Sequence, residues 1–273
     1  MNITRRQFLK GSAGALGSVI VISSPLSKLA KASHEKKSAR RPDLSGYDWD
    51  AHYYNFVVDT TKCIGCGRCV RACKLENHVP MEHEFNRTWV ERYVITEDEE
   101  VFIDSPEAGI EGFAKPHMNA KYEDLHIAES FFVPKLCNQC EKPPCVQVCP
   151  VAATYKTPDG IILVDQKRCI GCRYCIQACP YGARYLVPKG AEVSPSGETG
   201  VADKCTWCYH RITRGMPPAC VEACPVGARQ FGDIRDPESP IKEVLRQARI
   251  SVLKPSLGTK PKVFYIGLHM GVV

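Results

Sequence analysis

Apolar and polar residues alternate most clearly in residues 88–94, Thr-Trp-Val-Glu-Arg-Tyr-Val, and this pattern predicts a half-buried strand. Four acidic residues, 97–100, follow it. We interpret them as the solvated edge of a hairpin, with a docking surface as the alternative. Further along, Pro240 begins a predicted helix that ends at about Arg249, and Ser239 is its expected N-cap.

The longest apolar stretch, residues 11–22, is too short for the ~20 apolar residues of a membrane-spanning helix. Arg5-Arg6 precede it and Ala30-Lys31-Ala32 follow it, which together indicate a twin-arginine export signal cleaved near Ser33. The alternative is a basic amphipathic tail. Because the twin-arginine route exports folded proteins, a cofactor can be inserted in the reducing cytoplasm before the protein reaches the periplasm.

Charge and hydropathy argue against nucleic-acid binding and against a membrane-spanning helix in the mature chain. Five of the six net positive charges lie in residues 1–32, so the remainder is nearly neutral and offers no electrostatic argument for nucleic acid. The apolar run 263–268 is only as long as a strand. We therefore expect a soluble mature protein with no transmembrane helix of its own.

Sixteen cysteines form four complete sets of four. The first and third sets have the C-x2-C-x2-C-x3-C spacing of ferredoxins, the second has C-x2-C-x4-C-x3-C, and the fourth has a longer middle gap. Proline follows every set except the first, where Lys74 takes its place. The sets are Cys63, Cys66, Cys69 and Cys73; Cys137, Cys140, Cys145 and Cys149; Cys169, Cys172, Cys175 and Cys179; and Cys205, Cys208, Cys220 and Cys224.

Three other uses of cysteine fit this pattern less well than iron–sulfur clusters do. Cysteines spaced by only two residues make poor disulfide staples, although an even number in an exported protein permits them. Zinc prefers two C-x2-C pairs about 15–20 residues apart, which the first and third sets lack. Covalent haem needs histidine directly after C-x-x-C, whereas Tyr209 follows Cys208 and His210 comes one place later. Complete sets favour four [4Fe–4S] clusters, with Gly65 and Gly171 allowing the sharp loop turns.

The sets are related in pairs by internal duplication. The first and third sets coincide at an offset of 106 residues, with Val58-Asp59 matching Val164-Asp165. The fourth set resembles the second, because Pro217-Pro218 and Pro225-Val226 match Pro143-Pro144 and Pro150-Val151 around their cysteines. A two-cluster unit made of the second and third sets is therefore inserted between the halves of its own relative, in the nested order I-(II-III)-IV.

In ferredoxins the fourth cysteine of each set reaches the other cluster of its unit, and this crossing rule assigns the ligands. We name the resulting groups A to D. Group A is Cys63, Cys66, Cys69 and Cys224; group B is Cys205, Cys208, Cys220 and Cys73; group C is Cys137, Cys140, Cys145 and Cys179; group D is Cys169, Cys172, Cys175 and Cys149. Lys74 is expected to place a water-accessible positive charge beside group B. Trp207 is expected to shield a cluster from water, with electron tunnelling as the alternative.

These residues resemble the four-cluster iron–sulfur subunits of molybdopterin oxidoreductases and related quinone-linked respiratory complexes. The resemblance covers residues 54–270 and is carried by 137–145, 159–160, 169–175 and 205–233. It implies the same nested pairing. It also implies that the protein relays electrons between a membrane-integral quinone-interacting subunit and a molybdopterin or other catalytic subunit, with its own membrane attachment only through these partners.

The predicted fold class is α+β, with two ferredoxin-like dicluster units in nested order and long irregular loops. The expected segments are a signal peptide (1–32), an N-terminal extension (33–53), the first half of the outer unit with an insertion (54–130), the inner unit (131–190), the second half of the outer unit (191–235), and a C-terminal helix and tail (236–273). In such small units the clusters are expected to supply much of the folding free energy.

Electron transfer without a substrate site is the predicted function. A catalytic iron–sulfur enzyme would need an open iron site, which four-cysteine sets do not offer. The alternative is an iron–sulfur protein whose clusters are structural and serve partner binding, although a structural role rarely needs four clusters.

Overall fold

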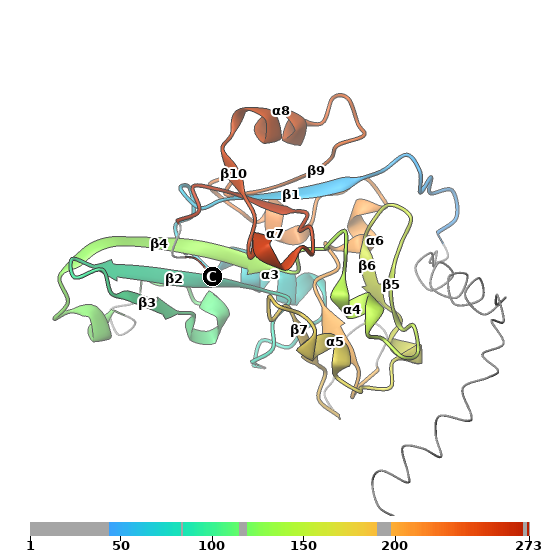
Figure 1. Ribbon diagram of the computed structural model, residues 1–273, viewed down its shortest axis with the longest axis horizontal. Helices are drawn as coiled ribbons and strands as arrows, with labels where there is room; N and C mark the ends of the chain where they lie inside the picture. The colour runs from blue at the N-terminus through green and yellow to red at the C-terminus, as the bar shows by residue number, and fades with distance from the viewer. Residues whose placement is uncertain (1–43, 83, 115–118, 190–197, 270–271, 273) are drawn as a thin grey trace, which may run out of the picture. The chain divides into compact units, whose positions relative to one another are not determined.

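The computed structural model describes residues 44–82, 84–114, 119–189, 198–269 and 272. The predicted export signal and most of the N-terminal extension lie outside these described residues. The described residues mix short helices and strands, as an α+β fold requires (Figure 1). No helix within the described ranges is both long and apolar enough to cross a membrane.

A four-stranded sheet joins the beginning and the end of the described residues. Its strands are β1 (Tyr54–Asp59), β9 (Arg229–Asp233), β10 (Ile250–Ser251) and β11 (Val263–Ile266), in the order β10-β11-β1-β9. All six residues of β1 are buried, since β9 pairs with one side of this strand and β11 with the other. The apolar run near the C-terminus is thus an interior strand and not a tail.

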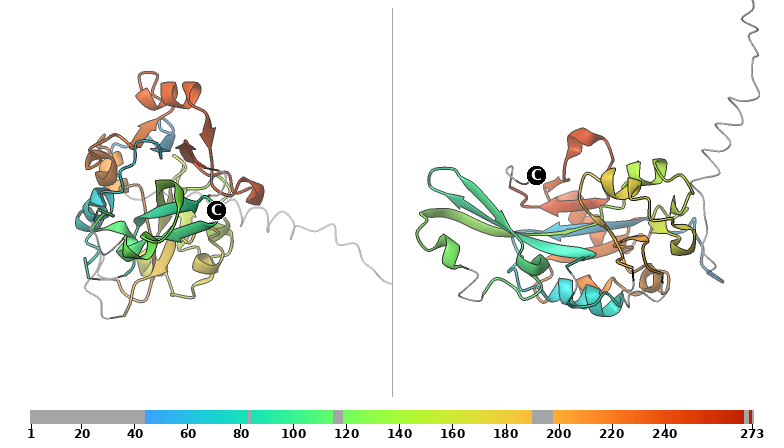
Figure 2. Two further views of the ribbon diagram at one scale, coloured as in Figure 1. Left: turned by 90° about the vertical axis from the view of Figure 1, so that its left-hand side faces the viewer. Right: turned by 90° about the horizontal axis from the view of Figure 1, so that it is seen from below.

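The predicted strand at residues 88–94 is confirmed as part of a long hairpin. β2 (Thr88–Thr96) lies between β3 (Val101–Asp104) and β4 (Ile127–Leu136), and this sheet extends away from the cysteine loops (Figures 1 and 2). Residues 97–100 are exposed and connect β2 to β3. The acidic run therefore lies at an exposed hairpin turn, as the first interpretation predicts.

Two smaller hairpins complete the sheet structure. β5 (Thr154–Lys156) pairs with β6 (Ile162–Val164), and β7 (Arg184–Leu186) pairs with β8 (Ala202–Lys204), both in antiparallel fashion. Short 3-10 turns lie at Pro106–Gly109, Ala120–Tyr122, Gln166–Arg168 and Pro255–Leu257.

Most of the described helices are single turns that contain a cysteine or directly follow one. They are α4 (Pro144–Gln147), α5 (Tyr174–Gln177), α6 (Tyr209–Ile212) and α7 (Ala219–Glu222). α3 (Arg68–Glu76) is nine residues long. Lys74 explains the difference, because the proline found after every other set would prevent a helix from continuing past the fourth cysteine.

The predicted C-terminal helix is present as α8 (Pro240–Gln247), which packs against β9. Ser239 occupies the N-cap position, but its side chain makes no capping hydrogen bond. Ser239 is therefore the N-cap residue as predicted, and the fixed φ of Pro240 at the first turn favours the start of α8.

One register occurs twice and positions the cysteine sets. β5 pairs with β6 so that Thr154 lies opposite Val164, and β9 pairs with β1 so that Arg229 lies opposite Val58. Thr154 and Arg229 each come five residues after the last cysteine of a set, and their partners come five residues before the first cysteine of another. The strands thus join the second set to the third, and the fourth set to the first.

Candidate metal centre

Group A is formed by two segments that are far apart in the sequence. Cys63 and Cys66 lie on the turn that leads into α3, and Cys69 lies in the first turn of that helix. Cys224 follows α7, which packs against α3. The four thiols and Arg229 line one small cavity. The crossing of Cys224 into the first cysteine loop is thus a feature of the geometry.

Group B surrounds Cys73, which is buried in α3. Burial raises the pKa of the Cys73 thiol well above its usual value, and the neighbouring thiols of Cys205, Cys220 and Cys208 raise it further. The Asn77 amide lies 3.6 Å from the Cys73 sulfur and 3.8 Å from that of Cys208. One side chain therefore donates to sulfurs that come from opposite ends of the outer unit.

Groups C and D lie where α4 packs against α5. Burial raises the pKa of Cys140 to about 12, and its neighbours Cys137, Cys145 and Cys179, the other members of group C, contribute. Group D is placed less directly, by the strand register and by backbone donors. The amide of Ala153 lies 3.2 Å from the Cys149 sulfur, and the amide of Ala202 lies 3.4 Å from the Cys169 sulfur.

The four groups form a row, because group B is next to group C. Cys137 is among the thiols that raise the pKa of Cys205, after burial and Cys220. Two of the sixteen cysteines are exposed, Cys66 in group A and Cys172 in group D. Group A is next to group B, since Cys69 acts on the pKa of Cys220, and groups C and D meet where α4 packs against α5. The groups therefore follow one another as A, B, C and D, and the first and the last each have an exposed cysteine.

Reciprocal hydrogen bonds join the loops of groups B and C. Trp207 Nε1 donates to the Cys137 carbonyl at 3.2 Å, and Gln139 Nε2 donates to the Cys205 carbonyl at 2.9 Å. Each donor stands two residues after the first cysteine of its own set, and each has a positive φ (56° and 44°). Trp207 is buried against Phe56 and Phe231, so its indole covers this junction.

Glycine is needed at equivalent places in the first and third sets. Gly65 and Gly171 have φ of +64° and +68°, in the left-handed region that side chains disfavour. A Cβ at Gly65 would lie 2.6 Å from the Phe132 ring, and one at Gly171 would overlap the Gly200 carbonyl. The ferredoxin-like turn in each set therefore depends on a residue without a side chain.

The buried polar groups around the thiols fit an anionic cofactor. Arg229 and Arg184 are 2% and 5% exposed, yet Nε and Nη1 of Arg229 and Nη2 of Arg184 have no hydrogen-bond partner among the described residues. Burial lowers the pKa of each guanidinium, but the surrounding thiols raise it more, so both stay charged. Two charged, partly unsatisfied guanidinium groups beside sets of thiols therefore fit the negative charge of thiolate-ligated iron–sulfur clusters.

The described residues contain neither a site for a single metal ion nor a disulfide. All sixteen cysteines lie in the described ranges and are free thiols. Within the same ranges, no group of three or more His, Cys, Asp or Glu side chains is placed to hold one metal ion.

Lys74 is buried, whereas the sequence predicts that its charge is accessible to water. It is 3% exposed, and its Nζ donates to the carbonyls of Pro80 at 3.0 Å and Met81 at 3.3 Å. Burial lowers the pKa of Lys74, whereas Glu82 and Cys73 raise it. The residue lies within α3 because that helix continues past Cys73, so its side chain folds onto the loop that follows the helix.

Sequence reasoning missed four polar residues at these sites: Asn77, Gln139, Arg184 and Arg229. A signal for two of them exists in their spacing from the cysteines. Arg184 and Arg229 each stand five residues after the last cysteine of a set. The roles of Asn77 and Gln139 depend on contacts between different sets, which a pattern within one set does not contain.

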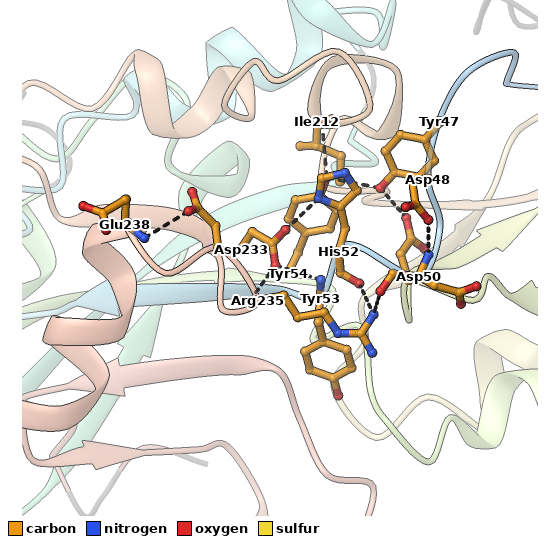
Figure 3. Close-up of polar contacts among 12 residues, drawn as sticks. Tyr47, Asp48, Asp50, His52, Tyr53, Tyr54, Ile212, Asp233, Arg235 and Glu238 are labelled. Atoms are coloured by element: carbon orange, nitrogen blue, oxygen red, sulfur yellow. Dashed lines mark hydrogen bonds and ion pairs between the residues drawn. The ribbon is translucent and has the colours of Figure 1, made fainter.

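A second cavity, of about 480 Å³, lies at the open end of the β1–β9 pair, and no cysteine lines it. His52 Nδ1 lies 2.7 Å from Asp233 Oδ2, while the Tyr53 amide donates to the other oxygen of Asp233 at 2.8 Å (Figure 3). Arg235 donates to the carbonyls of Asp50 and His52. These contacts close the strand pair on which the outer cysteine sets depend.

Comparison with protein families identifies 4Fe–4S dicluster domains in two overlapping stretches of the sequence. Residues 62–153 match one such family and residues 128–234 match another. Two dicluster domains indicate four [4Fe–4S] clusters, for which the sixteen cysteines are sufficient.

Curated relatives match most or nearly all of the sequence. A tetrathionate reductase subunit of Salmonella typhimurium is 40% identical over 98% of this protein and 90% of its own length. The Hdr-like menaquinol oxidoreductase iron–sulfur subunit 1 of Archaeoglobus fulgidus is 35% identical over 97% of this protein and 98% of its own length. One of the polysulfide reductase polypeptides of Wolinella succinogenes is 37% identical over 79% of this protein and 95% of its own length.

Proposed function

Because this protein belongs to the family of iron–sulfur subunits of molybdopterin oxidoreductase complexes, we propose that it relays electrons in the periplasm between a membrane quinone-handling subunit and a catalytic subunit, without a substrate site of its own. The single observation that carries this proposal is the row of four cysteine groups with an exposed cysteine at each end. A quinone-linked partner is supported by the name of the menaquinol oxidoreductase relative.

The proposed ligands are the crossed groups A to D, and the proposed domain order is nested. Three observations support both. The cavity of group A contains Cys224, Cys73 lies among the thiols of the fourth set, and Cys179 lies among those of the second. The repeated strand register extends the same arrangement to group D.

A [4Fe–4S] cluster supplies one-electron chemistry when bound, with a potential set by charge, hydrogen bonds and exposure. The protein contributes the environment. Asn77 and the backbone amides of Ala153, Trp207 and Ala202 donate to cysteine sulfurs, and such donors stabilise the more negative reduced state. Trp207 keeps water from the junction of groups B and C, which is the shielding role proposed for it.

The two exposed ends are the proposed contacts with the two partners. Ile64 is 58% exposed beside Cys63, and its duplicate Ile170 is 65% exposed beside Cys169. Tyr174, 62% exposed, adds to the apolar surface at the second end. Apolar side chains exposed next to redox cysteines are suited to excluding water when a partner docks.

Charged substitutions at these isoleucines test the relay in the assembled complex. We expect Ile64→Lys and Ile170→Lys each to slow electron exchange with one partner only, by about tenfold or more, with all iron retained. Rapid-mixing reduction by a quinol and reoxidation by the catalytic partner's substrate would measure the two exchanges separately. Unchanged rates in both variants, or loss of both rates in each, would contradict the proposal that the ends serve different partners.

Iron content tests the cofactor assignment in the wild-type protein. Anaerobically purified protein should contain about sixteen iron and sixteen sulfide per polypeptide. Stoichiometric zinc with little iron would exclude the cluster assignment.

The export proposal has a separate test. Replacing Arg5 and Arg6 by lysine is expected to retain the precursor in the cytoplasm with its clusters present, because the folded-protein route no longer recognises it. Cell fractionation followed by iron analysis would show this. Normal periplasmic accumulation of the double variant would contradict the twin-arginine assignment.

A further inference from the structure

Two buried arginines occupy equivalent places in the outer and inner units. The thiols that act most strongly on the charge of Arg229 are Cys69 and Cys220. Those that act most strongly on Arg184 are Cys145 and Cys175. Under the duplication, Cys69 matches Cys175 and Cys220 matches Cys145. Each guanidinium therefore lies between the two cysteine groups of one unit, A and B or C and D.

In the two units the arginine comes from strands that are not duplicates of each other. In the outer unit Arg229 on β9 donates to Thr88 on β2 at 2.8 Å, and in the inner unit Arg184 on β7 donates to Thr154 on β5 at 3.2 Å. Thr154 holds the register position of Arg229, opposite Val164 as Arg229 is opposite Val58. Thr88 and Arg184 also hold equivalent positions. Thr88 lies opposite the residue just before Cys137, and Arg184 lies opposite the residue just before Cys205. The arginine and threonine have exchanged strands, but the guanidinium has stayed between the clusters.

The charge of these two arginines is not neutralised by carboxylates. Within the described residues, Arg87 pairs with Asp203 and Arg92 with Asp104, whereas Arg184 and Arg229 form no ion pair. An uncompensated buried charge is strongly destabilising. Clusters with four thiolate ligands carry negative charge, and they gain one more negative charge when reduced. Each arginine is placed to offset this charge for two clusters at once.

We propose that Arg229 and Arg184 are redox-positioning residues, each of which raises the reduction potentials of both clusters in its own unit. The proposal rests on the proposed cluster ligands. A cation between two clusters stabilises the reduced form of either, because reduction adds negative charge beside it. The threonine partner holds the guanidinium in place and contributes no charge. A guanidinium lies between the cysteine groups of both units although it comes from different strands. This favours a requirement for its charge over chance packing.

The exchange of strands supplies the experiment. Arg229→Thr removes the charge and installs the residue that the inner unit has at this position. At a fixed ambient potential, we expect the oxidised-to-reduced ratio of two clusters to rise at least ~10-fold, equivalent to 59 mV for a one-electron couple. The double variant Arg229→Thr with Thr88→Arg copies the inner arrangement and should return both clusters towards their wild-type potentials. Redox titration monitored by electron paramagnetic resonance measures all four clusters.

Matched variants identify the pair of clusters concerned. Arg184→Thr should shift the other two clusters, with rescue by Thr154→Arg. Arg92→Met removes an equally buried arginine from the long hairpin, where Asp104 neutralises its charge, and should leave all four potentials unchanged. If both threonine variants shift the same clusters, if neither shifts any, or if the double variants do not restore the potentials, the proposal is wrong.

Iron content separates this proposal from the one on which it rests. Wild-type protein with far less than sixteen iron would contradict the proposed clusters themselves. Wild-type protein with full iron and variants with unchanged potentials would contradict only the role of the arginines. If Arg229→Thr assembles without two of its clusters, recovery of their iron in the double variant supports the charge requirement, and failure to recover contradicts it.

Discussion

The outer and inner units contain duplicated pairs of cysteine sets, but the rest of the protein surrounds them differently. Five of the eight cysteines assigned to the outer unit are buried, compared with three of eight in the inner unit. The strand pair of the outer unit, β1 with β9, is extended by β11 and β10 on its other side, whereas β5 and β6 form a sheet of two strands. The same local motif is thus enclosed to different degrees by segments outside it.

Continuity along the sequence also differs. The cysteines of the inner unit lie in one stretch, while the outer unit brings together segments separated by the whole inner unit. Closing the longer loop costs more conformational entropy, although the cost grows only slowly with length. The contacts that offset it are the buried β1 strand, the closure at Asp233 and the hydrogen bonds of Trp207 and Gln139. We therefore expect the outer unit to be the more sensitive to distant substitutions.

Replacing a crossing cysteine should have the largest effect and separates the two units directly. Cys73→Ser is expected to perturb or remove the cluster held by Cys205, Cys208 and Cys220, lowering the iron content from about sixteen to about twelve, and to spare the one held by Cys63, Cys66 and Cys69. Spectroscopy of the remaining clusters measures this. Cys179→Ser is the matched variant of the inner unit and should affect group C. Loss of the group A cluster in Cys73→Ser would show that the pairing is not crossed.

A charge in β11 should damage the outer unit selectively. Val263 is fully buried opposite Phe56, so Val263→Asp places a carboxylate without a partner in the core and is expected to cost about 3 kcal/mol or more. Thermal loss of iron–sulfur absorbance would show clusters A and B bleaching before C and D. Val101→Asp, on the exposed edge strand β3, is the control and should change stability by about 0.5 kcal/mol or less. Uniform bleaching in Val263→Asp would contradict the difference between the units.

The reciprocal hydrogen bonds at the junction should contribute a smaller amount. Gln139→Met removes the donor to the Cys205 carbonyl and the acceptor of the Ile162 amide, which lies 2.6 Å away. Leaving a buried group unsatisfied costs about 1–3 kcal/mol. Trp207→Phe removes the hydrogen bond to the Cys137 carbonyl together with part of the buried indole surface. Thermal loss of absorbance in the two single variants and the double variant would measure the coupling, and strict additivity would indicate that the two bonds act independently.

Lys74 should show the smallest effect. Lys74→Met removes a buried charge near Cys73, but Glu82 and Glu107 also act on this ammonium group and partly balance it. We expect the potential of the group B cluster to fall by less than the 59 mV that corresponds to a tenfold change in ratio. Lys74→Pro is unsuitable for this measurement because proline would interrupt α3. A shift larger than that of Arg229→Thr would overturn the ranking of these two cations.

Spacing and duplication in the sequence were sufficient for the cluster type, the family and the pairing hypothesis. This is because the ligands within one set are local, and a loop of about ten residues with cysteines in fixed places can wrap only one kind of site. The strand at 88–94 and the helix from Pro240 could also be predicted from the sequence. The strand depends on the alternation of its residues, and the helix on a proline at its start.

Tertiary structure alone decided which residues surround the thiols. The apolar run at the C-terminus could not be placed beside β1 from its own composition, and Lys74 reads as a surface lysine until its helix is seen to continue past Cys73. Arg229 and Arg184 are separate features of the sequence, on strands of different sheets. They become equivalent only when the strand registers bring each guanidinium between two cysteine groups, because burial and charge compensation depend on neighbours that are distant in the sequence.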